Sequence, residues 1–132
     1  MIQREVTNEL FSAAGEYPVV TIFGPRQSGK TTLVQMAFPD KSYVSLENPD
    51  VRIAAETDPR GFLSGYEQGA ILDEIQRVPT LLSYLQEIVD KRSQPGLFIL
   101  TGSHHQPELH QSVSPDPGWT VSNTHSPSIL IQ

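Results

Sequence analysis

The sequence predicts an α/β fold in which helices flank a mostly parallel β-sheet. Short apolar runs typical of buried strands alternate along the chain with segments whose apolar residues recur at helical spacing. A glycine-rich loop joins the first such strand to a helix, and two later strands end in acidic or small polar residues. Alternating strands and helices favour parallel strands joined by right-handed crossovers. The 132 residues are enough for one domain.

The first half of the chain is predicted to begin with a helix that Gly15 would end. A strand, a helix and a second strand follow, and these three elements would form a βαβ unit. The four elements are expected over residues 4–14, 19–23, 30–38 and 42–46.

The second half continues the alternation. Asn48 and Pro49 are expected to open a helix that Asp58 and Pro59 would end. The remaining elements are a buried strand over residues 69–73, a helix that begins behind Thr80 and closes at residues 94–96, and a strand over residues 97–100.

Residues 24–31 read Gly-Pro-Arg-Gln-Ser-Gly-Lys-Thr and match the phosphate-binding loop pattern G-x-x-x-x-G-K-[ST], the P-loop. The glycines let the backbone point its N–H groups at phosphates, Lys30 adds a cation, and the Thr31 hydroxyl can ligate Mg²⁺. A strand before the loop and a helix after it would aim a helix N-terminus at the anion. A glycine-rich surface turn is the alternative. The predicted nucleotide-binding residues of the loop are Gly24, Pro25, Arg26, Gln27, Ser28, Gly29, Lys30, Thr31 and Thr32, with the side chains of Arg26 and Gln27 turned away from the phosphates.

A second motif is the apolar strand that ends in Asp73 and Glu74. Such a strand delivers a carboxylate beside the bound phosphates, where Asp73 can hold Mg²⁺ directly or through water. The adjacent Glu74 is placed to orient and deprotonate an attacking water. Many strands simply end in solvated acids, but the preceding phosphate loop favours the functional interpretation.

A third signal comes from the small polar residues at the end of the last predicted strand. In a parallel sheet this carboxyl edge is shared with the phosphate loop. Thr101 or Ser103 could therefore contact the γ-phosphate or the water. An ordinary turn at the end of a strand is an equally good interpretation.

The composition limits the possible function classes. The net charge of −6 does not support nonspecific binding of nucleic acid, which needs clustered cations. The absence of cysteine excludes disulfides and thiolate metal sites. No apolar run has the length of a signal-peptide core or a membrane span, so we expect a soluble, cytoplasmic protein without membrane partners.

Four motifs in order give the chain a resemblance to the prokaryotic AAA-type ATP-binding proteins, in which an ATPase domain precedes a long C-terminal domain of unknown function. They are the P-loop, residues 43–47, the run from residue 71 to 77, and residues 98–103. The resemblance covers about residues 1–114 and implies an ATPase domain with ATP and Mg²⁺ as ligands. It also implies that residues 24–31 are the Walker A loop, that Asp73 and Glu74 are the Walker B pair with Glu74 as general base, and that Ser103 stands in the sensor-one position.

The chain departs from this family after about residue 114. No fifth strand is recognisable, except over residues 128–131, and a later arginine finger and the C-terminal domain are missing. We therefore expect a partial ATPase domain over residues 1–114, a fold incomplete at its C-terminal end, and an irregular tail over residues 115–132. One hypothesis is that the tail is a frameshifted reading of the family's continuation. Sequencing the encoding DNA tests it, because the shifted frame should yield a family-like strand and not an early stop.

The leading function is ATP binding with Mg²⁺, followed by hydrolysis if the site is complete. No guanine-recognition element Asn/Thr-Lys-x-Asp is present, which favours adenine. A nucleotide-gated binding module, a kinase for a small molecule and a nonfunctional truncated fragment remain as alternatives. A second copy of the chain or an unidentified protein is a possible partner beside the nucleotide.

Overall fold

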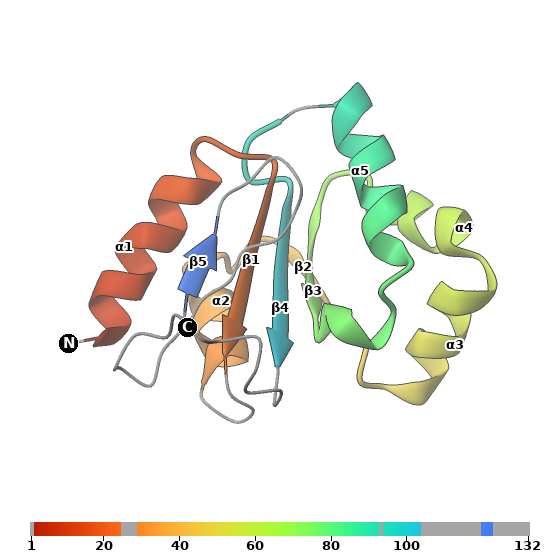
Figure 1. Cartoon of the computed structure of the whole chain (residues 1–132), viewed down its shortest axis with the longest axis horizontal. Helices are drawn as coiled ribbons and strands as arrows, with labels where there is room; N and C mark the ends of the chain where they lie inside the picture. Colours follow the sequence, from red (N-terminus) through yellow and green to blue (C-terminus); the bar gives the residue numbers. More distant parts are fainter. Residues whose placement is uncertain (1, 25–28, 93, 104–119, 123–132) are drawn as a thin grey trace.

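The computed structural model describes residues 2–24, 29–92, 94–103 and 120–122 of the chain (Figure 1). Helices and strands alternate along the described segments, as the sequence predicts. The elements are α1 (Ile2–Ala14), β1 (Val19–Gly24), α2 (Lys30–Ala37), β2 (Ser42–Ser45), α3 (Pro49–Thr57), α4 (Pro59–Ser64), β3 (Ala70–Asp73), the 3₁₀ turn η1 (Ile75–Arg77), α5 (Leu81–Lys91), β4 (Phe98–Ser103) and β5 (Thr120–Ser122).

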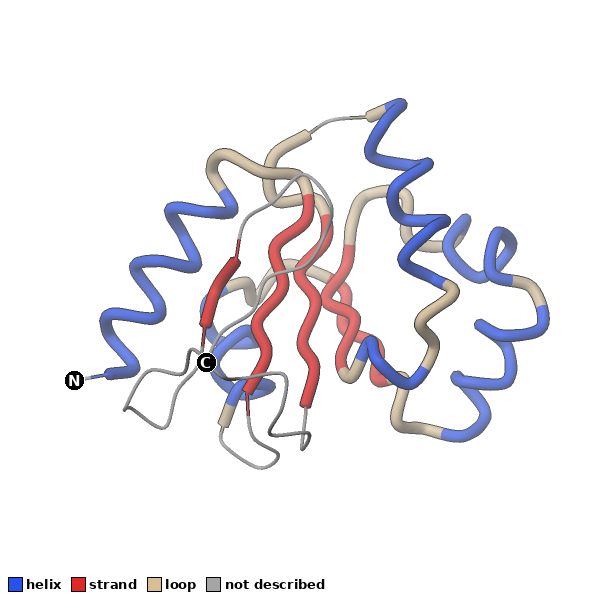
Figure 2. The backbone as a smooth tube through the Cα atoms, in the orientation of Figure 1, coloured by secondary structure: helices blue, strands red, loops and turns tan. Residues whose placement is uncertain are grey.

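The strands form one sheet in the order β2-β3-β4-β1-β5 (Figure 2). The strands β2, β3, β4 and β1 are parallel to one another, whereas β5 runs antiparallel to β1. This arrangement confirms the predicted α/β class with a mostly parallel sheet flanked by helices.

The strand β5 corrects the expectation that the tail holds no strand outside residues 128–131, a segment that lies outside the described residues. Only three residues of β5 pair with β1, and they read Thr-Val-Ser. Such a short segment has no apolar alternation to mark it in the sequence. Its position is set by backbone pairing with the edge of β1.

Two apolar clusters lie on opposite faces of the sheet because neighbouring residues of a strand point to opposite faces. Phe98 and Leu100 belong to the larger cluster with the apolar side chains of α3, α4 and α5, whereas Ile99 belongs to the smaller cluster with those of α1 and α2. In Figure 1, α1 lies on the left of the sheet and α3 to α5 lie together on the right. Since both faces are covered, every residue of β3 and β4 is buried.

In the connection between α3 and α4, one residue both ends the first helix and caps the second. Asp58 ends α3, as predicted, and its side chain then accepts a hydrogen bond from the Gly61 N–H at 3.1 Å as the N-cap of α4. Pro59 is the first residue of α4, where proline is favoured because the helix needs no N–H there. The predicted end of the helix at Asp58 is confirmed, whereas the short helix α4 that follows it was not predicted.

Candidate phosphate site

The predicted site residues lie at the carboxyl edge of the parallel strands. Gly24 ends β1, Asp73 ends β3 and Ser103 ends β4, while Lys30 is the first residue of α2. Gly24 and Ser103 are direct neighbours in the β1–β4 register. The strand β4 extends through Ser103 and not only to residue 100, so its polar end belongs to the sheet.

Lys30, Ser103 and Glu74 form a buried hydrogen-bonded chain. The Lys30 Nζ donates to the Ser103 Oγ at 3.3 Å, and this hydroxyl donates to the Glu74 Oε2 at 2.9 Å. The three residues expose only 3%, 4% and 7% of their surface, respectively. A lysine and a glutamate are rarely this buried unless they are paired or bound to polar groups. The arrangement therefore links a cation to a carboxylate through one hydroxyl.

A second set of contacts gathers on the Asp73 carboxylate, which is almost fully buried. Thr31 Oγ1 donates to its Oδ1 at 2.8 Å, and Tyr43 OH donates to its Oδ2 at 2.8 Å. Thr101 Oγ1 also donates to Oδ1 and accepts the Glu74 N–H at 3.0 Å. Hydroxyl and carboxylate oxygens are the ligands that Mg²⁺ prefers, and Mg²⁺ usually keeps phosphate and water as its other ligands. The donor set of Thr31 and Asp73 thus fits this ion.

Glu74 has a strained backbone. Its φ of 62° and ψ of 54° lie in the left-handed region, and among the described residues it is the only non-glycine residue with positive φ. Such a conformation costs about 1–3 kcal/mol and persists where surrounding contacts enforce it. Here the Glu74 N–H is held by Thr101, and the turn directs the side chain toward Ser103.

The remaining predicted residues divide into two groups. Gly29 has a φ of 88° and precedes α2, and Thr32 is exposed on α2 without joining the contacts described above. Pro25, Arg26, Gln27 and Ser28 lie outside the described residues. Arg77, the last residue of η1, lies 3.6 Å from the Glu47 carboxylate.

Two residues of this region were not predicted as site residues. Tyr43 lies on the edge strand β2, and Gln76 in η1 donates from its Nε2 to the Glu74 Oε1 at 2.6 Å. Both lie in runs that carry the family resemblance, residues 43–47 and 71–77, but the residue types alone assign them no role at the site. Gln76 follows Glu74 by two residues, and this short separation is the one sequence feature that suggests a contact between them.

Burial raises the pKa of the Tyr43 hydroxyl above its ordinary value, and the hydrogen bond to the Asp73 carboxylate adds to the effect. The folded state therefore keeps this proton above about pH 10, where a tyrosine in the unfolded chain loses it. The free energy of unfolding should consequently fall as the pH rises past that value. We expect a late step in the phenolate absorbance titration of the folded protein, and Tyr43→Phe should remove it. A titration curve whose late part survives this substitution would contradict the assignment.

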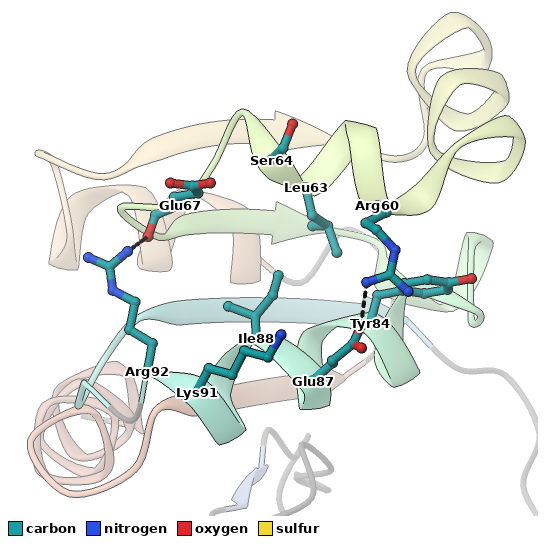
Figure 3. Close-up of a pocket in the computed structure, with 9 residues that line it drawn as sticks. All are labelled: Arg60, Leu63, Ser64, Glu67, Tyr84, Glu87, Ile88, Lys91 and Arg92. Carbon is teal, nitrogen blue, oxygen red and sulfur yellow. Dashed lines mark hydrogen bonds and ion pairs between the residues drawn. The ribbon is translucent and has the colours of Figure 1, made fainter.

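A separate hollow of about 310 Å³ lies between α4 and α5 (Figure 3). At one end Arg60 pairs with Glu87 at 2.8 Å and covers the Tyr84 ring at 5.2 Å from its centroid. None of the predicted site residues lines this hollow. Its lining consists of Arg60, Leu63, Ser64, Glu67, Tyr84, Glu87, Ile88, Lys91 and Arg92.

The fold and the position of the glycine-lysine-threonine loop between β1 and α2 define a P-loop nucleotide-binding domain. Residues 16–123 match the family described as AAA domain, and the chain belongs to this family. The match continues past residue 114, where the sequence resemblance was expected to end, and includes β5.

Uncharacterized proteins of Mycobacterium tuberculosis and Mycobacterium bovis are each 36% identical to the chain over 104 residues. The alignments cover 76% of this chain but only 23% of each relative, so the chain spans about a quarter of their length. A crystal structure of a DNA replication initiation factor superposes with a TM-score of 0.54 at 22% identity, covering 84% of this chain and 40% of that one. This likeness concerns the fold alone.

Within the part of the chain that the structure describes, no helix is long and apolar enough to cross a membrane.

Proposed function

We propose that this domain binds ATP together with Mg²⁺ and hydrolyses the bond between the β- and γ-phosphates. The observation that carries the proposal is the pair of adjoining contacts at the sheet edge. In the first contact the Thr31 hydroxyl donates a hydrogen bond to the Asp73 carboxylate. In the second, the Ser103 hydroxyl accepts a hydrogen bond from the Lys30 ammonium and donates one to the Glu74 carboxylate. The family supports nucleotide binding, and these contacts support the finer roles.

Each residue has a role that follows from its chemistry. Lys30 would balance the charge of the outer phosphates, and Thr31 and Asp73 would hold Mg²⁺, which when bound neutralises phosphate charge. Glu74 would orient the attacking water and accept its proton. Ser103 donates a hydrogen bond to Glu74. Because it ends β4, its hydroxyl would also contact the terminal phosphate.

We further propose a protein partner and a cytoplasmic location. The net charge of −6 does not support nucleic acid as the partner. A second copy of the chain or another protein is the expected partner, and a cytoplasmic location fits an ATP-dependent protein.

The test is the affinity for ATP of the variant Lys30→Met, which keeps the length of the buried side chain and removes its charge. Loss of one charge-assisted contact should weaken binding by about 10- to 100-fold. The affinity is measured by titration with a fluorescent ATP analogue in the presence of Mg²⁺, and chelation of the metal should also lower it.

Lys91→Met is the matched control, because Lys91 is exposed in the last turn of α5. Its affinity should equal that of the unmodified protein. A protein without measurable affinity for ATP, or an unchanged affinity of Lys30→Met, would refute the proposal.

A further inference from the structure

The side chain of Gln76 bridges the ends of two strands. Its Nε2 donates to the Glu74 Oε1 at 2.6 Å, and its Oε1 accepts the Ser103 N–H at 3.3 Å. We propose that Gln76 is a positioning residue that fixes the Glu74 carboxylate against Ser103 for hydrolysis. The inference rests on the proposed function, because it assigns Gln76 a part in the step that Glu74 would perform.

The chemistry of the two partners suits an amide at this position. A backbone N–H can only donate, and an ionised carboxylate can only accept. The side chain between Ser103 and Glu74 must therefore offer one acceptor and one donor. A glutamate in place of Gln76 would lack the donor, a lysine would lack the acceptor, and an asparagine would be one methylene shorter.

The backbone beside Gln76 leaves room for this contact. A Cβ atom added to Gly102 would lie 3.1 Å from the Gln76 Oε1 and 2.2 Å from the Phe23 Cε1. The absence of a side chain at Gly102 thus allows the amide and the Phe23 ring to approach β4 together. Gln76 as a residue is exposed, so the two hydrogen bonds, and not burial, hold its amide in place.

The contact completes the restraint of the Glu74 carboxylate. Ser103 Oγ holds one carboxylate oxygen and Gln76 holds the other, while Thr101 holds the Glu74 N–H. Each carboxylate oxygen has two lone pairs, so one donor on each leaves capacity for a water. Without Gln76, Ser103 is the remaining side chain among the described residues that bonds the carboxylate and opposes its rotation. A misplacement of about 1 Å can lower a rate about 100-fold.

The test compares Gln76→Met with Gln86→Met in the full chain. Gln86 donates to the Asp90 carboxylate at 3.0 Å on α5, so the control also loses a bond between an amide and a carboxylate. We expect Gln76→Met to lower kcat for phosphate release by about 10- to 100-fold with an ATP affinity within about twofold of the unmodified protein. Gln86→Met should leave both quantities unchanged. Amide hydrogen exchange should accelerate several-fold at Ser103 in Gln76→Met and not in Gln86→Met.

The two readouts separate the inference from the function on which it rests. An unchanged kcat of Gln76→Met, or a loss of affinity equal to the loss of kcat, would overturn the positioning role. Unchanged exchange at Ser103 would overturn the contact itself. An unmodified protein that binds ATP without releasing phosphate would refute hydrolysis and the positioning role of Gln76, whereas the exchange at Ser103 would still report the contact.

Discussion

Replacing Glu74 with glutamine should lower kcat for ATP hydrolysis by about 10²- to 10⁴-fold, the contribution of a positioned general base. The amide keeps the size of the side chain and can still accept the Ser103 hydroxyl hydrogen bond, but it cannot take a proton from water. Binding of ATP should stay within about twofold, because Lys30, Thr31 and Asp73 are untouched. Steady-state phosphate release and equilibrium titration measure the two quantities separately.

The matched control is Glu87→Gln, which removes the carboxylate that pairs with Arg60 at 2.8 Å. This pair joins α4 and α5, which pack on the opposite face of the sheet from α2. This variant should keep full turnover. If Glu74→Gln hydrolyses ATP as fast as the unmodified protein, Glu74 is not the base. Loss of ATP binding in Glu74→Gln would instead show that the substitution disturbs the site as a whole.

Replacing Gly69 with alanine should lower the free energy of unfolding by about 2–5 kcal/mol, from backbone strain and overpacking together. Gly69 precedes β3 with a φ of +98°, and a Cβ atom there would lie 2.1 Å from the Leu97 carbonyl oxygen. That oxygen accepts the Ala70 N–H at 3.1 Å where β3 and β4 begin to pair, so it cannot withdraw without breaking the pairing. Urea-induced unfolding followed by circular dichroism measures the effect.

Gly65→Ala provides the comparison within the same connection. Gly65 has a φ of −80°, and an added Cβ would meet only the Phe62 carbonyl oxygen at an ordinary 3.7 Å. This variant should be as stable as the unmodified protein or more stable by up to about 1 kcal/mol, since alanine restricts the unfolded chain. Equal losses of stability in the two variants would contradict the role assigned to Gly69.

Much of the fold could be predicted because its signals are local. Gly15 ends α1, and the Asn48 side chain caps α3 by accepting the Asp50 N–H at 2.9 Å. The strand, loop and helix around Lys30 follow from three adjoining segments with different periodicities. The sequence also predicted that Asp73, Glu74 and Ser103 lie at one edge of the sheet, because parallel strands bring their carboxyl ends together.

The missed features depend on contacts between distant residues. The sequence order gives no reason for β4 to lie between β3 and β1, yet this order brings Ser103 next to Gly24 and within reach of Glu74. Tyr43 reaches Asp73 only because β2 and β3 are neighbours. The sequence left Thr101 as a possible contact of phosphate or water, and the structure instead engages its hydroxyl with Asp73 and the Glu74 backbone.

The helix α2, which carries Lys30 and Thr31, is less well anchored to the core than the strands that carry the other site residues. It has eight residues, of which only Lys30 and Val34 are buried, and its N-cap residue, Gly29, has no side chain that could cap it. An isolated helix of this length is marginal in water, so its order depends on the sheet behind it and on whatever binds at its first turn. Transient local opening would dismantle half of the site while the larger apolar cluster under α5 stays folded. Nucleotide binding and the folding of α2 are therefore thermodynamically linked. Conditions that unfold α2 should lower the affinity for the nucleotide before they unfold the rest of the domain.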